Sequence, residues 1–514
     1  MTTVLNWLDH LVIAPVLLPF AAGVLLLLLR DQSMVMQRSL ALLAGLLQLG
    51  LTIALLLQVA DGQMLVYRLG NWPAPWGIVL VADRLAAWML LLTSLLALCA
   101  LVYALGGSDR QGRHFHVLFQ MQLCGLAGAF LTGDLFNLFV FFEILLIASY
   151  GLALHGGGPL RTRAGLHYVV MNLLGSTVFL FAAGLIYSAL GSLNLADLAA
   201  KAARLPADNL GLARAGGLLL LAVFGLKAAL VPLHLWLPAA YANTSAAVAA
   251  LFAIMTKVGI YAILRTHTLL FGSSGGELAG LFDPWLLPLA MATLTLATLG
   301  VLAAQNLGQM AAYLVVASVG TLLAALALGL PGIAAGLYYL VHSSFSAALL
   351  FLLADAIRRR RPLAGDRFTP DADMAQHALW GSLFFFAAIA AAGLPPLSGF
   401  VGKFLILRAT PQHPWVWAVI LLAALASVMA LARAGSALFF NTTAALARTG
   451  NLAGTPVAPL VPLAAHELLA IGGLIGLILA LTAGAGPVLD YVQATAAQLA
   501  DPALYIQAVL GAGR

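Results

Sequence analysis

The sequence predicts an all-α polytopic membrane protein. Of its 514 residues, 63% are hydrophobic and only 8% are charged, whereas ordinary soluble domains carry about 25% charged residues. Apolar stretches long enough to cross about 30 Å of hydrocarbon recur along the whole chain. The net charge of +6 is no sign of nucleic-acid binding, because the arginines gather in short segments between the apolar stretches.

These stretches predict about fourteen transmembrane helices and no soluble domain or linker. The first stretch lacks the basic start and the small-residue cleavage site of a signal peptide, so we expect it to be retained as a helix. The predicted spans are residues 11–29, 38–59, 84–105, 115–132, 134–154, 164–190, 211–239, 244–266, 284–304, 309–329, 333–357, 377–408, 414–438 and 463–483.

Three connecting features follow from local composition. The run MLVYRLGNWPAPWGIVLVAD, between the second and third helices, has two β-branched segments around a Trp/Pro/Gly turn and predicts a small extracellular hairpin. Asp134 and Asn137 are expected to cap the fifth helix. Residues 486–514 are less apolar and predict a short amphipathic helix on the outer surface. Cys99 and Cys124 have no metal or redox spacing and are expected to pack in apolar surroundings.

The basic residues predict the orientation, because cytoplasmic loops of membrane proteins are enriched in lysine and arginine. The loops after odd-numbered helices are therefore expected to be cytoplasmic, with both termini outside. Asp355 and the run Arg358 to Arg361 are interpreted as a solvated helix end. The odd-numbered loops hold Arg30, Arg38, Arg110, Arg113, Arg161, Arg163, Arg358 to Arg361, Arg367 and Arg448, and the others hold chiefly Arg68, Lys201, Arg204 and Arg408.

Two of the predicted helices contain prolines that should break them. Helix seven carries Pro232 in GLKAALVPLHLWLPAAY, and helix twelve carries Pro395 and Pro396 in GLPPLSGFVGKFLIL. Such breaks are tolerated at membrane depth only beside protein or water. The breaks lie five helices apart, as expected if helices four to eight (about 115–266) and nine to thirteen (about 284–438) form inverted repeats. Matched breaks of this kind mark transport sites.

Four ionisable residues lie inside the apolar stretches: Glu143, Lys227, Lys257 and Lys403. A charge at the bilayer centre costs at least about 2.5–3.5 kcal/mol, so such residues usually face one another or a wet cavity and serve ion transport. We expect Glu143 and Lys227 to pair, and Lys257 to lie in mid-helix. The alternatives are structural ion pairs, and for Lys403 a side chain that extends to the interface.

Histidine and hydroxyl residues are weaker candidates. His342, in the middle of helix eleven, can relay protons or can be a neutral core histidine. His234, beside the first break, is expected to cap freed carbonyls. His466 and Glu467 open the last helix, where they can have an interfacial or a functional role. Serine also packs helices in membranes. The hydroxyls that can hold water are those of Tyr313, Ser318, Ser343, Ser344 and Ser346.

No phosphate-binding loop, cysteine cluster or dinucleotide fingerprint occurs in the sequence, so we expect no nucleotide, metal or other cofactor. An ion gradient or a partner subunit would then drive transport.

Four ordered motifs resemble the antiporter-like proton-translocating family, which includes the Mrp (Pha) cation/proton antiporters and three membrane subunits of respiratory complex I. They are DLFNLFVFFEILLIASY, K-x(4)-P-x-H-x-W-L-P from Lys227, TKVGIYAILR and GLPPLSGFVGKF. The hairpin GNWPAPWGIVLVAD, AYLVVASVGTLL and DPALYIQAVLGA are similar to the D subunit of the Mrp antiporters. The resemblance implies fourteen helices, two inverted five-helix repeats and a midplane polar axis through Glu143, Lys227, Lys257 and Lys403.

The sequence departs from this family at two places. Many relatives have H-x(3)-K in helix eleven, where this chain has His342 and then Ser346. Relatives also often carry basic residues where this chain has Gly308 and Gln309. The relay from Lys257 to Lys403 must then use His342, hydroxyls and water, or be interrupted.

The resemblance implies a proton-conducting subunit, not an enzyme, that exchanges sodium or potassium for protons in the bacterial cytoplasmic membrane. Its expected partners are other Mrp subunits, including ones similar to the A and C subunits, and lipid, but not nucleic acid. One alternative is a redox-driven pump subunit of a complex I-like dehydrogenase or membrane-bound hydrogenase, which genetic context would distinguish. Another is a structural scaffold, against which the insertion cost of four buried charges argues.

Overall fold

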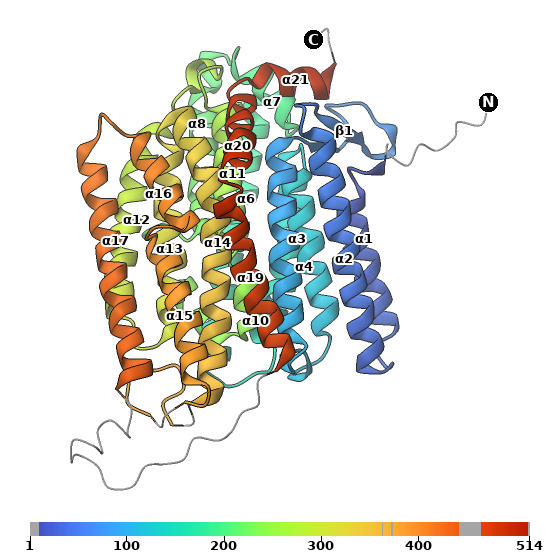
Figure 1. The fold of residues 1–514 in the computed structure, drawn as a ribbon. Coiled ribbons are helices and arrows are strands. Elements are labelled where there is room, and N and C mark those ends of the chain that lie inside the picture. Colours follow the sequence, from blue (N-terminus) through green and yellow to red (C-terminus); the bar gives the residue numbers. More distant parts are fainter. Residues whose placement is uncertain (1–9, 362, 372–373, 442–463, 512–514) are drawn as a thin grey trace.

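The computed structural model describes residues 10–441 and 464–511, apart from residues 362 and 372–373. The described chain forms a bundle of long helices that run side by side, with a two-stranded hairpin and short helices at one end (Figure 1). Within these residues, eleven helices are long and apolar enough to cross a membrane, and α1, α4 and α15 are shorter apolar helices.

The first part of the bundle includes three short helices, α7, α9 and α10, besides the long ones. Its helices are α1 (Ala14–Leu28), α2 (Met34–Val59), α3 (Arg84–Ala104), α4 (Phe115–Leu131), α5 (Leu135–Leu154), α6 (Pro159–Leu190), α7 (Leu195–Ala202), α8 (Leu210–Ala228), α9 (Trp236–Asn243), α10 (Ala246–Phe252) and α11 (Met255–Leu270).

The second part is arranged around the long helix α14. Its helices are α12 (Asp283–Ala303), α13 (Leu307–Leu326), α14 (Gly329–Arg360), α15 (His377–Ala392), α16 (Ser398–Arg408), α17 (Pro414–Gly435), which continues into a π-helical turn (Ser436–Phe440), α19 (Ala465–Ala483), α20 (Ala485–Leu499) and α21 (Pro502–Leu510).

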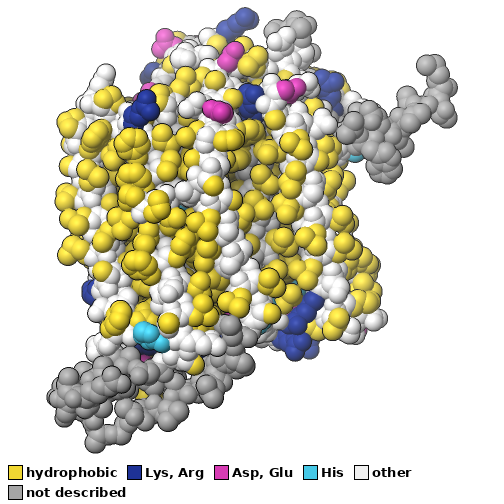
Figure 2. Space-filling model, viewed as in Figure 1, with side chains coloured by type: hydrophobic (Ala, Val, Ile, Leu, Met, Phe, Trp, Pro, Cys, Tyr) yellow, Lys and Arg dark blue, Asp and Glu magenta, His cyan; other side chains and the backbone are white. Residues whose placement is uncertain are grey.

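The surface of the bundle has the polarity of a membrane protein. Hydrophobic side chains cover the middle of the visible face, and charged side chains gather toward its two ends (Figure 2). Large apolar residues such as Leu57, Phe181 and Leu422 are more than half exposed, which would be unfavourable in water over so wide an area. The predicted polytopic α-helical class is therefore confirmed.

The predicted hairpin is also confirmed. Strands β1 (Leu65–Arg68) and β2 (Val79–Ala82) pair in antiparallel register, with Leu65 opposite Ala82. All four residues of β2 are buried, so the hairpin packs against the end of the bundle. The predicted cap of α5 is present as well, because the Asp134 carboxylate accepts the Asn137 backbone N–H at 2.8 Å. Asn137 itself does not cap; its amide donates to the Thr132 hydroxyl.

Both predicted helix breaks are present, and a third appears. Helix α8 ends where Ala229 adopts a left-handed conformation (φ 59°), and α15 ends at Gly393 (φ 76°). The predicted span 244–266 corresponds to one apolar segment, Ala246–Leu270, that is long enough to cross a membrane, but a turn at Ala253 and Ile254 divides it into α10 and α11. Lys257 consequently lies in the first turn of α11 rather than in mid-helix.

The C-terminal tail forms two helices where the sequence predicts one. Helix α20 follows α19 after Gly484 and packs along α14, and α21 crosses the end of the bundle (Figure 1). Asp501 separates the two helices, since its carboxylate accepts the Ala503 backbone N–H and Pro502 occupies the first helical position, where proline is favoured.

Candidate functional site

The first break carries Lys227, and its nearest acid is Glu143 on α5. Lys227 Nζ donates to Asn172 Oδ1 at 3.3 Å, and the Ser176 hydroxyl donates to the Glu143 carboxylate. Asn172 and Ser176 lie one turn apart on α6 and therefore on one face of that helix. No salt bridge joins Glu143 to Lys227 in the described chain, and each member of the expected pair instead bonds to its own side chain on the same face of α6.

Trp236 and Thr293 satisfy the backbone at this break. Trp236 Nε1 donates to the Leu226 carbonyl at 3.2 Å, and the Val231 backbone N–H donates to Thr293 Oγ1 at 3.0 Å. His234 does not cap as expected, because its buried Nδ1 has no hydrogen-bond partner among the described residues. Beside Lys227 lies a cavity of about 10 Å³ that Asn172 also lines. The packing around Lys227 therefore leaves room for about one water molecule.

Lys257 is buried beside the third break. Its Nζ donates to Ser318 Oγ at 3.1 Å, and the Ser318 hydroxyl donates to the Val315 carbonyl. The predicted candidates Lys257 and Ser318 are thus in contact across α11 and α13. Tyr313, one and a half turns earlier on α13, lies against Gly300 of α12 and does not line the cavity described below.

The second predicted break brings two candidates to the end of α15. His342 Nε2 lies 3.0 Å from the Ala390 carbonyl, and its Nδ1 lies 2.9 Å from the Ser398 hydroxyl. A carbonyl only accepts, so Nε2 carries a hydrogen. Lys403 Nζ donates to the Ala392 carbonyl at 2.7 Å. Lys403 therefore points to the break that Pro395 and Pro396 create rather than outward.

A cavity of about 40 Å³ connects these groups, and its lining includes Ser318, His342, Ser346 and Lys403. A water molecule needs about 10–15 Å³, so the cavity has room for about three. The Ser346 hydroxyl is buried and has no hydrogen-bond partner in the part of the chain described. A polar space thus lies where many relatives carry a lysine side chain.

The sequence alone did not identify Asn172, Ser176 or Thr293 as candidate site residues. The signal for the first two was present, because an amide and a hydroxyl four residues apart interrupt the apolar run 164–190.

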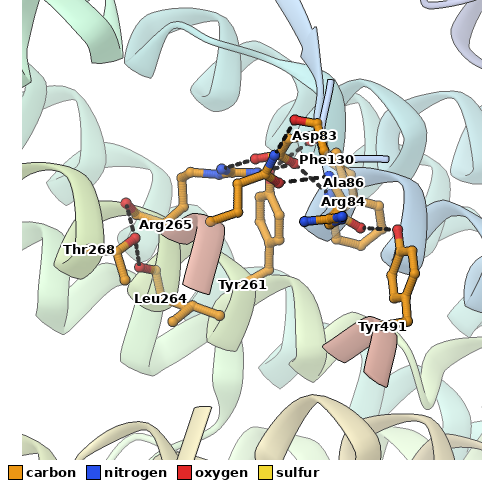
Figure 3. Close-up of polar contacts among 11 residues, drawn as sticks. Asp83, Arg84, Ala86, Phe130, Tyr261, Leu264, Arg265, Thr268 and Tyr491 are labelled. Carbon is orange, nitrogen blue, oxygen red and sulfur yellow. Dashed lines mark hydrogen bonds and ion pairs between the residues drawn. The ribbon is translucent and has the colours of Figure 1, made fainter. Parts of the chain in front are cut away.

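A buried ion pair beyond the lysines was also missed. Arg265 Nη1 and Nη2 contact the two carboxylate oxygens of Asp83 at 2.5 and 2.9 Å (Figure 3). Tyr261 lies between this pair and the neighbouring helix, and its hydroxyl donates to the Phe130 carbonyl. Because Asp83 caps the start of α3 and Arg265 lies in the last two turns of α11, the pair fixes these two helices together. Breaking such a pair typically costs about 3–5 kcal/mol.

The end of α14 contradicts part of one prediction. Asp355, Arg360 and Arg361 are buried rather than solvated, whereas Arg358 is exposed as expected, and Glu467 beside them is 2% exposed. Arg360 Nη2 lies 2.7 Å from Glu467 Oε2, and Arg359 Nη2 lies 2.6 Å from Asp355 Oδ2. Helix α19 packs on α14 and α3 and covers these charges, an arrangement that the local sequence does not predict.

A further charge cluster ties α2 to the connection between α3 and α4. Arg38 Nε and Nη2 each lie 2.7 Å from the Asp109 carboxylate, and His116 Nε2 lies 3.2 Å from it. Burial raises the pKa of Asp109, but the hydrogen bonds from His116 and Arg38 outweigh it and lower this pKa to about 2. Asp109 is therefore ionised at all physiological pH values.

Comparison with known proteins identifies the family. A family model described as "NADH:quinone oxidoreductase/Mrp antiporter, TM" matches residues 132–430. The D subunit of a "Probable K(+)/H(+) antiporter" of Rhizobium meliloti (strain 1021) is 41% identical over 546 residues, which cover 99% of each chain. The chain belongs to the NADH:quinone oxidoreductase/Mrp antiporter family. Another member of this family, the D subunit of a "Na(+)/H(+) antiporter" of Alkalihalophilus pseudofirmus, is 36% identical over 510 residues, 98% of this chain and 100% of that one.

Solved structures of the antiporter family agree. A chain in the Mrp complex from Dietzia sp. DQ12-45-1b matches 99% of this chain and 100% of its own length, with a TM-score of 0.84 and 28% identity. A chain of respiratory complex I from Thermus thermophilus with bound NADH matches 95% of this chain and 100% of its own, with a TM-score of 0.78 and 25% identity. The family resemblance predicted from four motifs is confirmed, and the chain is a multi-pass membrane protein.

Proposed function

We propose that this chain is the D-type, proton-translocating subunit of a multisubunit antiporter that exchanges sodium or potassium for protons. The relatives that match its whole length are named as D subunits of such antiporters. The observation that carries the proposal is the series of ionisable side chains at breaks in the bundle, of which Lys227, Lys257 and Lys403 each have one polar partner. The chain is a transport subunit and not an enzyme.

The proposed path runs along these groups. Glu143 and Lys227, which Ser176 and Asn172 of α6 hold in position, exchange protons with each other, and Lys227 passes them toward Lys257. The cavity lined by Ser318, Ser346 and His342 then leads to Lys403. Its room for about three waters supports a hydrated step where the helix-eleven lysine of relatives is absent.

We further propose fourteen membrane spans, formed by the eleven long helices and the three shorter apolar ones. The short helices that follow the breaks belong to these spans and are not counted separately. Residues of about 115–266 and 284–438 would form the two inverted repeats, with the breaks after α8 and α15 at matching places. Arginine placement supports a location in the bacterial cytoplasmic membrane with both termini outside. The partners would be other Mrp-type subunits, including ones similar to the A and C subunits, and lipid.

A second candidate is a proton-pumping subunit of a complex I-like dehydrogenase or hydrogenase. The similarity to the complex I chain at a TM-score of 0.78 favours it. In that case proton movement would depend on oxidation of an electron donor, whereas an antiporter responds to a sodium or potassium gradient alone.

The test uses the complete complex in everted vesicles from bacteria that lack other antiporters. Addition of sodium or potassium should dissipate a preformed pH gradient without any electron donor. Lys227→Ala should abolish this response, while Lys201→Ala, a matched change at a surface lysine paired with Asp197, should preserve it. Exchange at the unmodified rate in an assembled Lys227→Ala complex would refute the proposal.

A further inference from the structure

Two buried polar groups without partners flank the break between α10 and α11. Thr256 Oγ1 and Gln122 Oε1 have no hydrogen-bond partner among the described residues. Both residues are fully buried, at 0% exposure. A buried polar atom that makes no hydrogen bond is costly and rare in native proteins, so both groups need a partner that lies between the helices.

The Thr256 hydroxyl is free because of the break. A threonine inside a helix usually donates to the carbonyl four residues earlier, as Thr266 does to Ala262 at 2.8 Å. The corresponding carbonyl for Thr256 is that of Phe252, which accepts the Tyr241 hydroxyl at 2.9 Å instead. The Thr256 hydroxyl is therefore available for a partner other than its own helix.

Gln122 approaches the same place from α4. Its Nε2 lies 2.9 Å from the Met255 sulfur, which is only a weak acceptor, and its Oε1 is unpaired within the described chain. Met255 directly precedes Thr256 in the chain. Two residues earlier on α4, Gln120 donates to the Ala41 carbonyl and faces α2 instead. Tyr261 of α11 also donates to Phe130 of α4 (Figure 3), so the two helices are in contact along this stretch.

The position of this break relates it to two lysines. Met255 lines the cavity of about 10 Å³ that contains Lys227 and Asn172, and this volume is close to the smallest that holds a water molecule. Lys257 is the residue after Thr256 and donates to Ser318 on α13. Met255, which the Gln122 amide contacts and which precedes Thr256 in the chain, thus links the two residues with unpaired oxygens to the Lys227 cavity on one side, while Lys257 follows Thr256 on the other.

We infer that Gln122 and Thr256 hold a water molecule at the α10–α11 break that passes protons between Lys227 and Lys257. This inference rests on the proposed function and names two positioning residues for it. The water accepts a proton from one side as it releases another to the other side, so no charge accumulates on it. The threonine hydroxyl and the amide oxygen orient the water and do not themselves exchange protons.

The test compares three threonine variants in the complete complex in everted vesicles. Thr256→Val keeps the shape but removes the hydroxyl, and the antiport rate should fall about tenfold or more with an unchanged apparent KM for the cation. Thr256→Ser restores a hydroxyl and should transport at nearly the wild-type rate. Thr266→Val, the matched control on the same helix, should also transport normally because its hydroxyl bonds only to the helix.

Gln122→Met provides a second variant that does not depend on the folding of the first, with Gln120→Met as its control. Gln122→Met should lower the antiport rate as Thr256→Val does, whereas Gln120→Met should not. Wild-type rates in Thr256→Val or Gln122→Met, or equal impairment of Thr256→Val and Thr256→Ser, would overturn the inference. Lys227→Ala and Lys257→Ala are measured alongside: if these are active, the proposed function itself fails, and if they are inactive while Thr256→Val is active, only the water site fails.

Discussion

Helices α8 and α15 both end at a residue in the left-handed conformation, but the lysines beside these two breaks have different hydrogen-bond partners. At the first, a neutral indole, Trp236, donates to the Leu226 carbonyl, and Lys227 donates to the amide oxygen of Asn172. One turn farther along α6, Ser176 donates to Glu143 of α5. At the second, the ionisable groups His342 and Lys403 themselves bind the freed carbonyls. An interrupted helix can therefore accommodate a lysine through a nearby acid or through its own backbone.

The surroundings of the two lysines differ accordingly. The cavity beside Lys227 measures about 10 Å³ and that beside Lys403 about 40 Å³. Among the residues that line the larger cavity there is no aspartate or glutamate. We therefore expect the first site to depend on its acid, and the second on hydration and on the exchange of hydrogen bonds with backbone carbonyls.

The largest expected effect is at the acid. Glu143→Ala removes the acid expected to pair with Lys227 and leaves Lys227 with neutral partners, so it should abolish antiport while the protein still inserts. The measurement is sodium- or potassium-dependent proton exchange in vesicles. Glu277→Ala, at an exposed glutamate, is the control and should be active. Normal exchange in Glu143→Ala would show that the two breaks do not differ in this way.

The next effect tests the second break. If His342 and cavity water replace the lysine of relatives, His342→Ala should reduce transport severely, and His342→Lys should restore part of it. His167→Ala, at an exposed histidine of α6, serves as the control. A packing role predicts instead that His342→Ala transports nearly normally with only a small loss of stability from the cavity.

A smaller effect concerns the neutral cap of the first break. Trp236→Phe keeps an aromatic ring but removes the indole hydrogen bond to the Leu226 carbonyl, which keeps its bond from the Ala229 N–H, so we expect a loss of about 0.5–1.5 kcal/mol in the free energy of unfolding. Thermal unfolding of the purified protein measures this loss. Trp285→Phe, at a half-exposed tryptophan, should have no comparable effect. If both variants melt alike, the cap is not what stabilises the break.

The smallest expected effect concerns the stability of the folded protein in acid. Since the pKa of Asp109 is about 2 in the folded protein and 3.8 in its ordinary state, its ion pair contributes full stability above pH about 4 and loses it as the pH falls toward about 2. Asp109→Asn should lower the melting temperature at neutral pH and flatten its decline in that acidic window. Asp208→Asn, at an exposed aspartate, should melt like wild type. An equally steep decline in Asp109→Asn would contradict this role.

Local patterns predicted much of this arrangement. The apolar runs and the prolines at 232, 395 and 396 act on their own neighbourhoods, so the bundle and two of its breaks followed from the sequence. The break after Phe252 has no proline or glycine within it and depends on Tyr241, which the fold brings to the Phe252 carbonyl. The burial of Glu467 likewise depends on how α19 packs against α14.

The candidate site shows the same division. Lys227, Lys257 and Lys403 were evident because each is costly in an apolar helix, and Ser318 was a candidate as a hydroxyl. Their pairing was not evident, since contacts such as Lys257 with Ser318 join residues far apart in the chain. The Asp83–Arg265 pair was missed because both residues lie near helix ends, where charges usually need no explanation.

The account requires that Lys403 change its protonation state, and one comparison tests this most directly. An arginine in its place keeps the charge and remains protonated at any working pH. Lys403→Arg and Lys403→Ala, measured side by side at equal expression, should impair antiport to nearly the same extent. A fully active arginine variant beside an inactive alanine variant would show that Lys403 is a structural cation and would contradict the proposed path.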